Sequence, residues 1–352
     1  MTSADIARLR FINQRISDLS KATVKELVAW MGAMQAQDFS MCKWAVGVRM
    51  AGSTEKMVEK AIDSGEIIRT HLMRPTWHLV SSDDIRWMLE LTAPQIKASL
   101  KSRHRELEIT NAVLRKSNSL LFKALKGSNH LSREELVKMF DQYGISTGNN
   151  RASHLLLFAE LDGIICSGVI KGRSSAYALL DERVPPAKKM TRTDALALLA
   201  RKYFSSHGPA TLQDFTWWSG LPVRDTRNAL EMIKADFNAE KSGDEVYWMP
   251  CSLNKPVPDK LPAVLLPAYD EFIISYRDRS ASLSEKNMGK AVSSNGIFRP
   301  VILVRCQVTG LWRKTNVKNQ VNVETQFLMK PDKSTRINID AAIQSYVSFC
   351  ER

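Results

Sequence analysis

Two glutamines stand two residues apart at Gln35 and Gln37, and Asp38 follows directly. An amide side chain donates and accepts hydrogen bonds without titrating, so this pair can hold a water molecule or bind the edge of a nucleobase. On a regular helix, residues i and i+2 point apart by about 200°, whereas in an extended segment or a turn they share a face. We therefore predict that the glutamines lie at a helix end or in a loop. The alternative interpretation is a solvent-exposed helix C-terminus.

A polar stretch at residues 74–78 is the second candidate. Strand alternation predicts that Arg74, Thr76 and His78 share one strand face and that Trp77 lies on the other. The functional interpretation is a polar wall beside the glutamines. The alternative is a hairpin strand that contains a packed histidine.

Basic side chains at Arg277 and Arg279 form the third candidate, just after an apolar stretch that ends near residue 274. Their functional interpretation is contact with phosphate groups or the lining of a binding site. The alternative is ion pairing with one of three nearby acids, Asp270, Glu271 and Asp278.

Hydrophobic periodicity predicts the elements that position these side chains. A helix begins at Thr23, where Thr23 and Glu26 have capping-box spacing, and its apolar face fades after Met34. Other helices are predicted over residues 4–18, 40–50 and 54–65. Residues 66–80 predict two strands joined by a turn at Arg74 and Pro75 or just before them.

A helix that stops at a glycine and is followed by a basic hairpin recurs along the chain. Residues 61–79 and 159–179 share this pattern, and a helix-turn-helix over 211–233 precedes a strand at 245–248. We interpret these as three tandem winged-helix units joined by a basic connector over 83–126. The Trp217–Trp218 pair is assigned to the core, and a base-stacking platform is the alternative. The helix over 223–233 is either a recognition helix or structural packing, and it carries Arg224, Arg227 and Asn228.

Four prolines between residues 250 and 262 predict a linker, after which short strands dominate until a terminal helix over 338–350. The predicted domains are a first winged helix with the glutamine motif over 1–82 and connector helices with a second winged helix over 83–188. A third winged helix over 189–255 and a mostly-β domain with a terminal helix over 256–352 follow.

The overall charge favours a polyanionic partner. The 352 residues include 50 Lys and Arg against 37 Asp and Glu, which gives a formal charge of +13. The five cysteines are scattered without a C-x-x-C pair, the histidines show no metal-binding spacing, and we see no secretory signal or membrane span. We therefore expect a cytoplasmic protein without a zinc site.

Three stretches occur in a fixed order together with the winged-helix units. They are Gln-Ala-Gln at 35–37, RTHLMRPTWH at 69–78, and LLPAYDEF at 265–272 followed by YRDR at 276–279. In this combination the chain resembles the AlkZ-like DNA glycosylases over nearly its whole length. The resemblance implies an α+β fold in which tandem winged helices pack on a C-terminal β-barrel-like domain. It also implies monofunctional excision of N7-alkylated purines, including bulky adducts and, in some members, interstrand crosslinks.

The family's glutamine–apolar–glutamine motif matches Gln35, Ala36 and Gln37, which places the chain in the Gln-x-Gln branch. An N7-alkylguanine is already cationic and leaves as a neutral base, so a positioned water and dipoles that stabilise the sugar cation are the main requirements. We assign water positioning to Gln35 and Gln37, with Asp38 as a candidate for activating the water or stabilising the cation. For DNA contact we assign six residues: Arg74, Thr76, His78, Arg277, Arg279 and Arg299.

The expected partner is double-stranded DNA with alkylated purines, bound by a monomer without a metal, a cofactor or a membrane. A closed base-flipping pocket cannot accept a base tethered to the other strand, so an open cleft is the hypothesis for crosslinks. One alternative function is a non-catalytic winged-helix transcriptional regulator, which the basic helix over 223–233 favours. A protein-interaction scaffold is a further alternative, and it predicts little salt-dependent DNA affinity.

Overall fold

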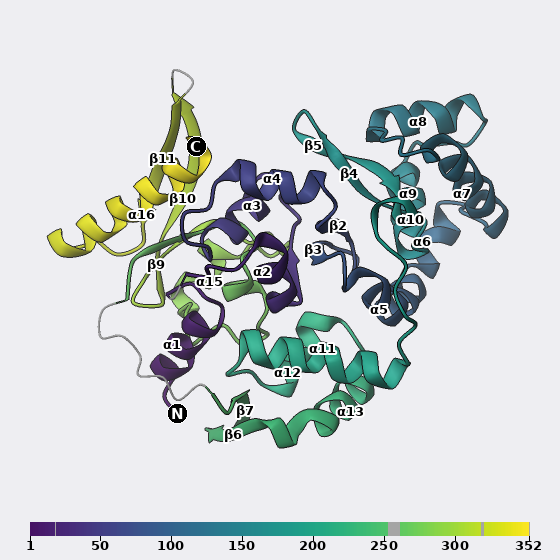
Figure 1. The fold of residues 1–352 in the computed structure, drawn as a ribbon. Helices are drawn as coiled ribbons and strands as arrows, with labels where there is room; N and C mark the ends of the chain where they lie inside the picture. The colour runs from purple at the N-terminus through teal and green to yellow at the C-terminus, as the bar shows by residue number, and fades with distance from the viewer. Residues whose placement is uncertain (18, 253–260, 318–319, 352) are drawn as a thin grey trace.

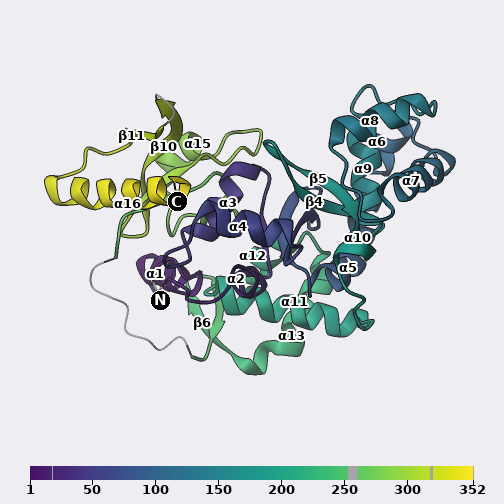
Figure 2. The same ribbon diagram turned by 45° about the horizontal axis from the view of Figure 1, so that its top comes forward.

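The structure is a computed structural model that describes residues 1–17, 19–252, 261–317 and 320–351. Its helices and strands confirm a mixed α+β architecture (Figure 1). The N-terminal segment that carries the glutamine motif lies in the middle of the molecule, between the C-terminal unit and the helices of residues 111–161. A second view agrees with this arrangement (Figure 2).

Thr23 starts the helix that leads into the motif. Its side chain accepts a hydrogen bond from the Glu26 N–H, and the Glu26 carboxylate accepts one from the Thr23 N–H, so the predicted capping box is confirmed. Gly32 ends this helix at a φ of +77°, which an L side chain rarely adopts, and the chain turns into a short strand. The elements of this unit are α1 (Ser3–Asn13), α2 (Val24–Met31), β1 (Ala33–Gln35), α3 (Phe39–Gly47), α4 (Glu55–Asp63), β2 (Ile67–His71) and β3 (Trp77–Ser81).

A three-stranded antiparallel sheet holds the motif. Its order is β1-β3-β2, so β1 is an edge strand and β3 lies in the centre. The predicted pair of strands around a turn near Arg74 is confirmed as β2 and β3. The cross-strand register aligns Gln35 with His78, and His78 with Thr70.

Two further helix–hairpin units follow in the predicted order. A capping box at Ser132 and Glu135 and another at Thr211 and Asp214 start one helix of each unit. Each unit ends in a two-stranded antiparallel hairpin. The elements are α5 (Ile85–Ser99), α6 (Lys101–Glu106), α7 (Asn111–Leu125), α8 (Arg133–Gln142), α9 (Arg151–Leu161), β4 (Ile165–Lys171), β5 (Ser174–Leu179) and α10 (Leu180–Arg183), then α11 (Arg192–His207), α12 (Leu212–Ser219), α13 (Val223–Ile233), a 3₁₀ turn (Lys234–Asp236), β6 (Phe237–Ser242) and β7 (Glu245–Pro250).

The C-terminal unit is an open four-stranded antiparallel sheet in the order β11-β10-β9-β8. The barrel-like expectation is therefore wrong: within residues 261–317 and 320–351 the edge strands do not pair with each other. Helices cover the apolar face instead, since Tyr346 packs edge-to-face against both Trp44 and Trp312, with ring centroids 5.2 and 4.7 Å away. The elements are β8 (Val264–Leu266), α14 (Glu271–Ile274), α15 (Glu285–Ala291), β9 (Val301–Val304), β10 (Gln307–Val317), β11 (Gln320–Phe327) and α16 (Lys333–Glu351).

Three hydrophobic cores hold the units together. The first joins α1 to α4 with the C-terminal sheet, the second lies between the β1-β3-β2 sheet and helices α5, α11, α12 and α13, and the third is built from α7, α8, α9, β4 and β5. The motif segment thus lies between two cores. Of the predicted linker, Pro250 ends β7 and residues 253–260 lie outside the described residues.

Candidate active site

The glutamine motif lies where β1 ends. Gln35 is the last residue of β1, the Ala36 N–H donates to the Trp77 carbonyl at 2.8 Å, and a bend follows at Gln37. Gln35 is only 3% exposed, whereas Gln37 and Asp38 are exposed. The prediction that the motif leaves helical geometry is confirmed. Asp38 is the N-cap of α3, where it accepts from the Met41 N–H at 3.0 Å.

A row of buried polar side chains crosses the sheet at Gln35. Residues directly opposite each other on antiparallel strands share a face, so Gln35, His78 and Thr70 lie side by side. One polar atom of each is buried without a hydrogen-bond partner among the described residues: Gln35 Oε1, His78 Nε2 and Thr70 Oγ1. Unpaired buried polar atoms are costly, so this row offers hydrogen-bonding capacity to a water or a substrate group. Sequence reasoning missed Thr70, because its place beside His78 depends on register.

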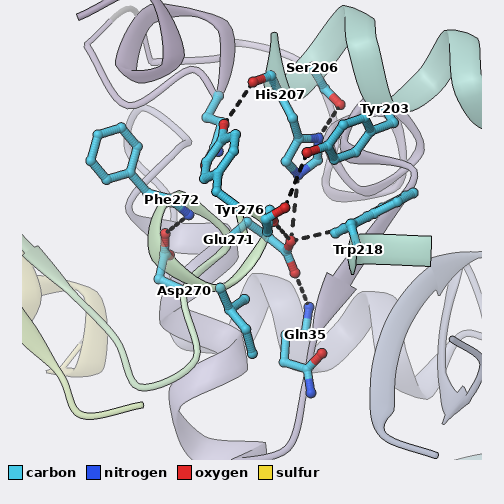
Figure 3. A network of polar contacts seen from close by, with 12 residues as sticks. Gln35, Tyr203, Ser206, His207, Trp218, Asp270, Glu271, Phe272 and Tyr276 are labelled. Atoms are coloured by element: carbon cyan, nitrogen blue, oxygen red, sulfur yellow. Dashed lines mark hydrogen bonds and ion pairs between the residues drawn. The ribbon is translucent and has the colours of Figure 1, made fainter. Parts of the chain in front are cut away.

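A carboxylate from the C-terminal unit anchors the motif strand. The Gln35 N–H, on the side of β1 that has no neighbouring strand, donates to Glu271 Oε1 at 2.5 Å. Trp218 Nε1 donates to Oε2 at 3.2 Å, Ser275 Oγ also donates to Oε2, and His207 Nε2 lies 3.5 Å away. Figure 3 shows these groups converging on Glu271, while the Gln35 side-chain amide points away from it.

Burial and hydrogen bonding set the charge of this network. Burial alone raises the pKa of Glu271, but the neighbouring His207 imidazole and hydrogen bonds from Ser275 and the Gln35 N–H lower it to about 2. Burial lowers the pKa of His207, whose Nδ1 lies 2.8 Å from Ser206 Oγ. At neutral pH the network is therefore a neutral imidazole beside a buried carboxylate, and one negative charge lies behind the motif strand.

The neighbouring acid is held separately. Asp270 receives two hydrogen bonds from the fully buried Arg49 guanidinium, at 2.8 and 2.9 Å, and caps α14 through the Phe272 N–H. Sequence reasoning considered Asp270 and Glu271 only as partners for Arg277 or Arg279. Two adjacent acids within an apolar stretch were the available signal that both are buried and paired elsewhere.

Two of the predicted DNA-contact arginines meet on an aromatic ring. Arg74 and Arg279 lie with their guanidinium carbons 5.4 and 5.3 Å from the Trp217 ring, and Arg279 also lies 5.1 Å from Phe298. Burial lowers the pKa of both arginines. The two neighbouring tryptophans differ in burial. Trp218 is in the core, as predicted, but Trp217 is 38% exposed.

The strand-face prediction for residues 74–78 is wrong in its geometry. Arg74, at a φ of +52°, and Thr76 lie in the turn before β3, and the Thr76 hydroxyl donates to the Met73 carbonyl at 3.0 Å. Of the three polar residues only His78 belongs to the strand, and at 1% exposure it fits the packed-histidine alternative. Trp77 is the first residue of β3 and lies on the opposite face from His78, as predicted. Burial lowers the pKa of His78 to about 3, so its imidazole is neutral.

The remaining predicted contacts, Arg277 and Arg299, are exposed. Arg277 Nη1 donates to Gln213 Oε1 at 2.8 Å. In the described part of the chain, neither these two residues nor Arg74 or Arg279 pairs with a carboxylate within 4.0 Å, so the ion-pairing alternative is not observed. Among all residues that the structure describes, no cluster of three or more histidines, cysteines or acids is suited to a metal. In the same part of the chain no helix is long and apolar enough to cross a membrane.

Comparison with known proteins identifies the family to which the chain belongs. Residues 28–349 match the family model described as DNA glycosylase AlkZ-like. The chain belongs to the AlkZ-like DNA glycosylase family. A curated AlkZ-like relative from Streptomyces sahachiroi, named interstrand DNA cross-link repair glycosylase, is 21% identical over 318 residues, which are 86% of this chain and 85% of that one. The solved structure of Streptomyces sahachiroi DNA glycosylase AlkZ has the same fold, with a TM-score of 0.81 at 18% identity over 100% of this chain and 98% of that one.

Proposed function

We propose that this AlkZ-like protein is a monofunctional DNA glycosylase that excises N7-alkylated purines, including bulky or crosslinked ones. Water attacks the sugar C1′, and Gln35 and Gln37 position that water. The observation that carries the proposal is the buried, unpartnered Gln35 Oε1 at the end of β1, in a row with His78 Nε2 and Thr70 Oγ1. These atoms supply acceptors and donors for a water, and the exposed Gln37 follows directly.

The charge distribution suits the proposed chemistry. Departure of a cationic N7-alkylpurine leaves positive charge on the sugar, and the departing base is neutral, so no strong general acid is required. Fixed dipoles and charges that oppose this developing charge lower the barrier. The Gln35 amide dipole and the ionised Glu271 behind β1 both stabilise the positive charge that develops on the sugar. The exposed Asp38 is retained as the lesser candidate for activating the water.

Binding of duplex DNA is assigned to the basic side chains around the motif. Arg74 and Arg279 at Trp217, with Arg277 and Arg299, supply cations that pair with no carboxylate in the described residues. Thr76 and His78 are folded inward, so we propose that they support the Arg74 turn. The crosslink assignment rests on the exposure of Gln37 and Asp38, because a motif outside a closed cavity does not require full extrusion of the base. The division into four domains over residues 1–82, 83–188, 189–255 and 256–352 remains part of this proposal.

Incubation with a duplex that holds one N7-methylguanine, followed by alkali, tests the proposal. The wild-type chain should give strand breaks at the lesion only after alkali, as expected for a glycosylase without lyase activity. Gln37→Ala should lower the rate about a hundredfold, the scale of losing one transition-state hydrogen-bond donor. Gln344→Ala on the exposed face of α16 is the matched control and should behave as wild type. No cleavage above background in the wild type contradicts the assignment.

A non-catalytic DNA-binding regulator is the second candidate. Arg224, Arg227 and Asn228 are exposed on α13, as a recognition helix requires. This function predicts a sequence-selective footprint, full DNA binding by Gln37→Ala, and no abasic product. The alkali assay and a footprint on random-sequence duplex therefore separate the two candidates.

A further inference from the structure

A cavity of about 370 Å³ lies on the other face of the motif sheet, between the β2–β3 end, α9 and the β4–β5 hairpin. Successive strand residues point to opposite faces, so Trp77, in the cavity wall, faces away from the row that contains His78. The cavity still adjoins the motif, because Arg69 lines it and donates Nε to the Ala36 carbonyl at 3.0 Å. Its volume lies within the range of small-molecule sites, about 300–1,000 Å³.

Flat groups in close contact form one wall of the cavity. The Arg69 guanidinium lies 4.1 Å from the Trp77 ring centroid, and the His71 ring packs against Trp77 at 4.0 Å with the two planes tilted by 41°. Glu160, which is fully buried, hydrogen-bonds His71 Nδ1 and holds that ring in place. A wall of guanidinium and aromatic planes, pre-organised by a buried carboxylate, favours a planar aromatic occupant.

Polar atoms in the cavity lining lack partners. Ser175 Oγ and His154 Nδ1 are buried without a hydrogen-bond partner among the described residues. Burial lowers the pKa of His154, so its imidazole is neutral and can donate or accept. An occupant with a hydrogen-bonding edge would satisfy both atoms and remove their desolvation cost.

The charge of the lining restricts the occupant further. Arg69 and Arg133 both line the cavity, and none of its described lining residues is an acid. A cationic ligand is therefore disfavoured, whereas a neutral heterocycle rich in acceptors is favoured.

We propose that this cavity is a nucleobase-binding site separate from the catalytic motif, for a neutral base that is either free or unstacked from duplex DNA. Planarity, acceptor content and a hydrogen-bonding edge are the features that the wall, the arginines and the unpartnered atoms select. The expectation that duplex DNA supplies the base rests on the proposed function. The expectation that the cavity binds a base does not rest on it, since binding requires no excision.

Fluorescence titration with free 2-aminopurine tests the first source. The wild-type chain should quench the probe saturably, because the base stacks on Trp77. Ser153→Trp fills the cavity from α9 and should weaken binding at least about tenfold, the scale of one stacked base. Ser119→Trp, on the exposed face of α7, is the matched control and should bind as wild type. Ser175→Ala removes an unpartnered hydroxyl, so it should keep the unfolding midpoint and weaken binding about fivefold.

Anisotropy with duplexes tests the second source. The wild-type chain should bind a duplex with one bulged purine more tightly than the fully paired duplex, and Ser153→Trp should abolish that preference.

The proposal is overturned if the wild type shows neither saturable quenching nor a bulge preference. It is also overturned if Ser153→Trp, shown to be folded by thermal unfolding, retains both. If Ser153→Trp does not fold, Ser175→Ala decides: unchanged affinity for both probes overturns the site. Binding without alkali-labile product supports the nucleobase site and contradicts only the glycosylase assignment.

Discussion

Burial decides the protonation state of the two histidines nearest the motif. His78 and His207 both have lowered pKa values because their charged forms are poorly solvated in the interior, and Arg74 adds repulsion at His78. Both are therefore neutral hydrogen-bonding groups near pH 7 and not cations that would compete with a positive sugar. The sequence alone predicted that the glutamine motif lies outside regular helix, since two amides two residues apart act together only outside a helix; that Gln35 ends a strand was not predicted. It could not predict the Glu271 anchor, which depends on how distant segments pack.

His78 makes stability depend on pH. In the unfolded chain it binds a proton near its ordinary pKa of 6.5, whereas in the folded chain it does so only near about 3. The unfolded state therefore binds more protons between these values, and stability falls as pH falls through that window by up to about 1.4 kcal/mol per pH unit. Urea unfolding of wild type and His78→Gln across the window checks this. The His78→Gln curve should be flatter, and parallel curves would contradict the pKa shift.

At the scale of elements, one side chain both ends the motif and starts a helix. Asp38 caps α3 through the Met41 N–H, so its loss acts first on the helix. Asp38→Ala should lower the free energy of unfolding by about 1 kcal/mol, whereas Asp38→Asn keeps the cap and should keep stability. We also expect Asp38→Asn to retain most of the excision rate. Loss of excision in a fully stable Asp38→Asn chain would instead assign the water-activating role to the carboxylate.

Arg49 joins the segment after α3 to the N-terminus of α14. Arg49→Met leaves the buried Asp270 carboxylate without its partner and should cost about 3–5 kcal/mol of stability. Arg103→Met breaks the exposed Arg103–Glu106 pair and is the control, with an expected cost below about 1 kcal/mol. Chemical denaturation measures both. Equal costs for the two variants would mean that Asp270 finds another partner or takes up a proton.

The hairpins and the C-terminal sheet differ in how far local sequence specifies them. Capping boxes at Thr23, Ser132 and Thr211 and glycine stops before the hairpins are local features, and each predicted an element that the structure contains. Local sequence does not determine whether a sheet closes into a barrel or stays open. The strand periodicity of residues 263–327 is compatible with a barrel or an open sheet. In the structure α16 covers the sheet, since its Tyr346 packs against Trp312 on β10 and against Trp44 of α3.

For the whole molecule, the charge of +13 predicts DNA affinity that falls steeply with salt. Arg277→Ala and Arg279→Ala should each lower the slope of log Kd against log salt by about 1, because each removes one phosphate contact. Arg336→Ala removes an arginine already paired with Asp340 on α16 and should leave the slope unchanged. Fluorescence anisotropy over a salt series checks this. Equal slopes for all three variants and wild type would place the DNA elsewhere on the surface.

The hydrogen bond from the Gln35 N–H to Glu271 spans 236 residues of sequence. During synthesis the helices and hairpins of the first 250 residues leave the ribosome before Glu271 does, and local pairing of β1 with β3 needs no later segment. The anchor on the motif strand therefore forms last. A nascent chain that ends before Glu271 lacks this anchor and also lacks Arg277, Arg279 and Arg299, three of the arginines to which we assign DNA contact. The proposed bond-breaking activity and most of the proposed DNA-binding surface therefore arise together, when the C-terminal unit docks.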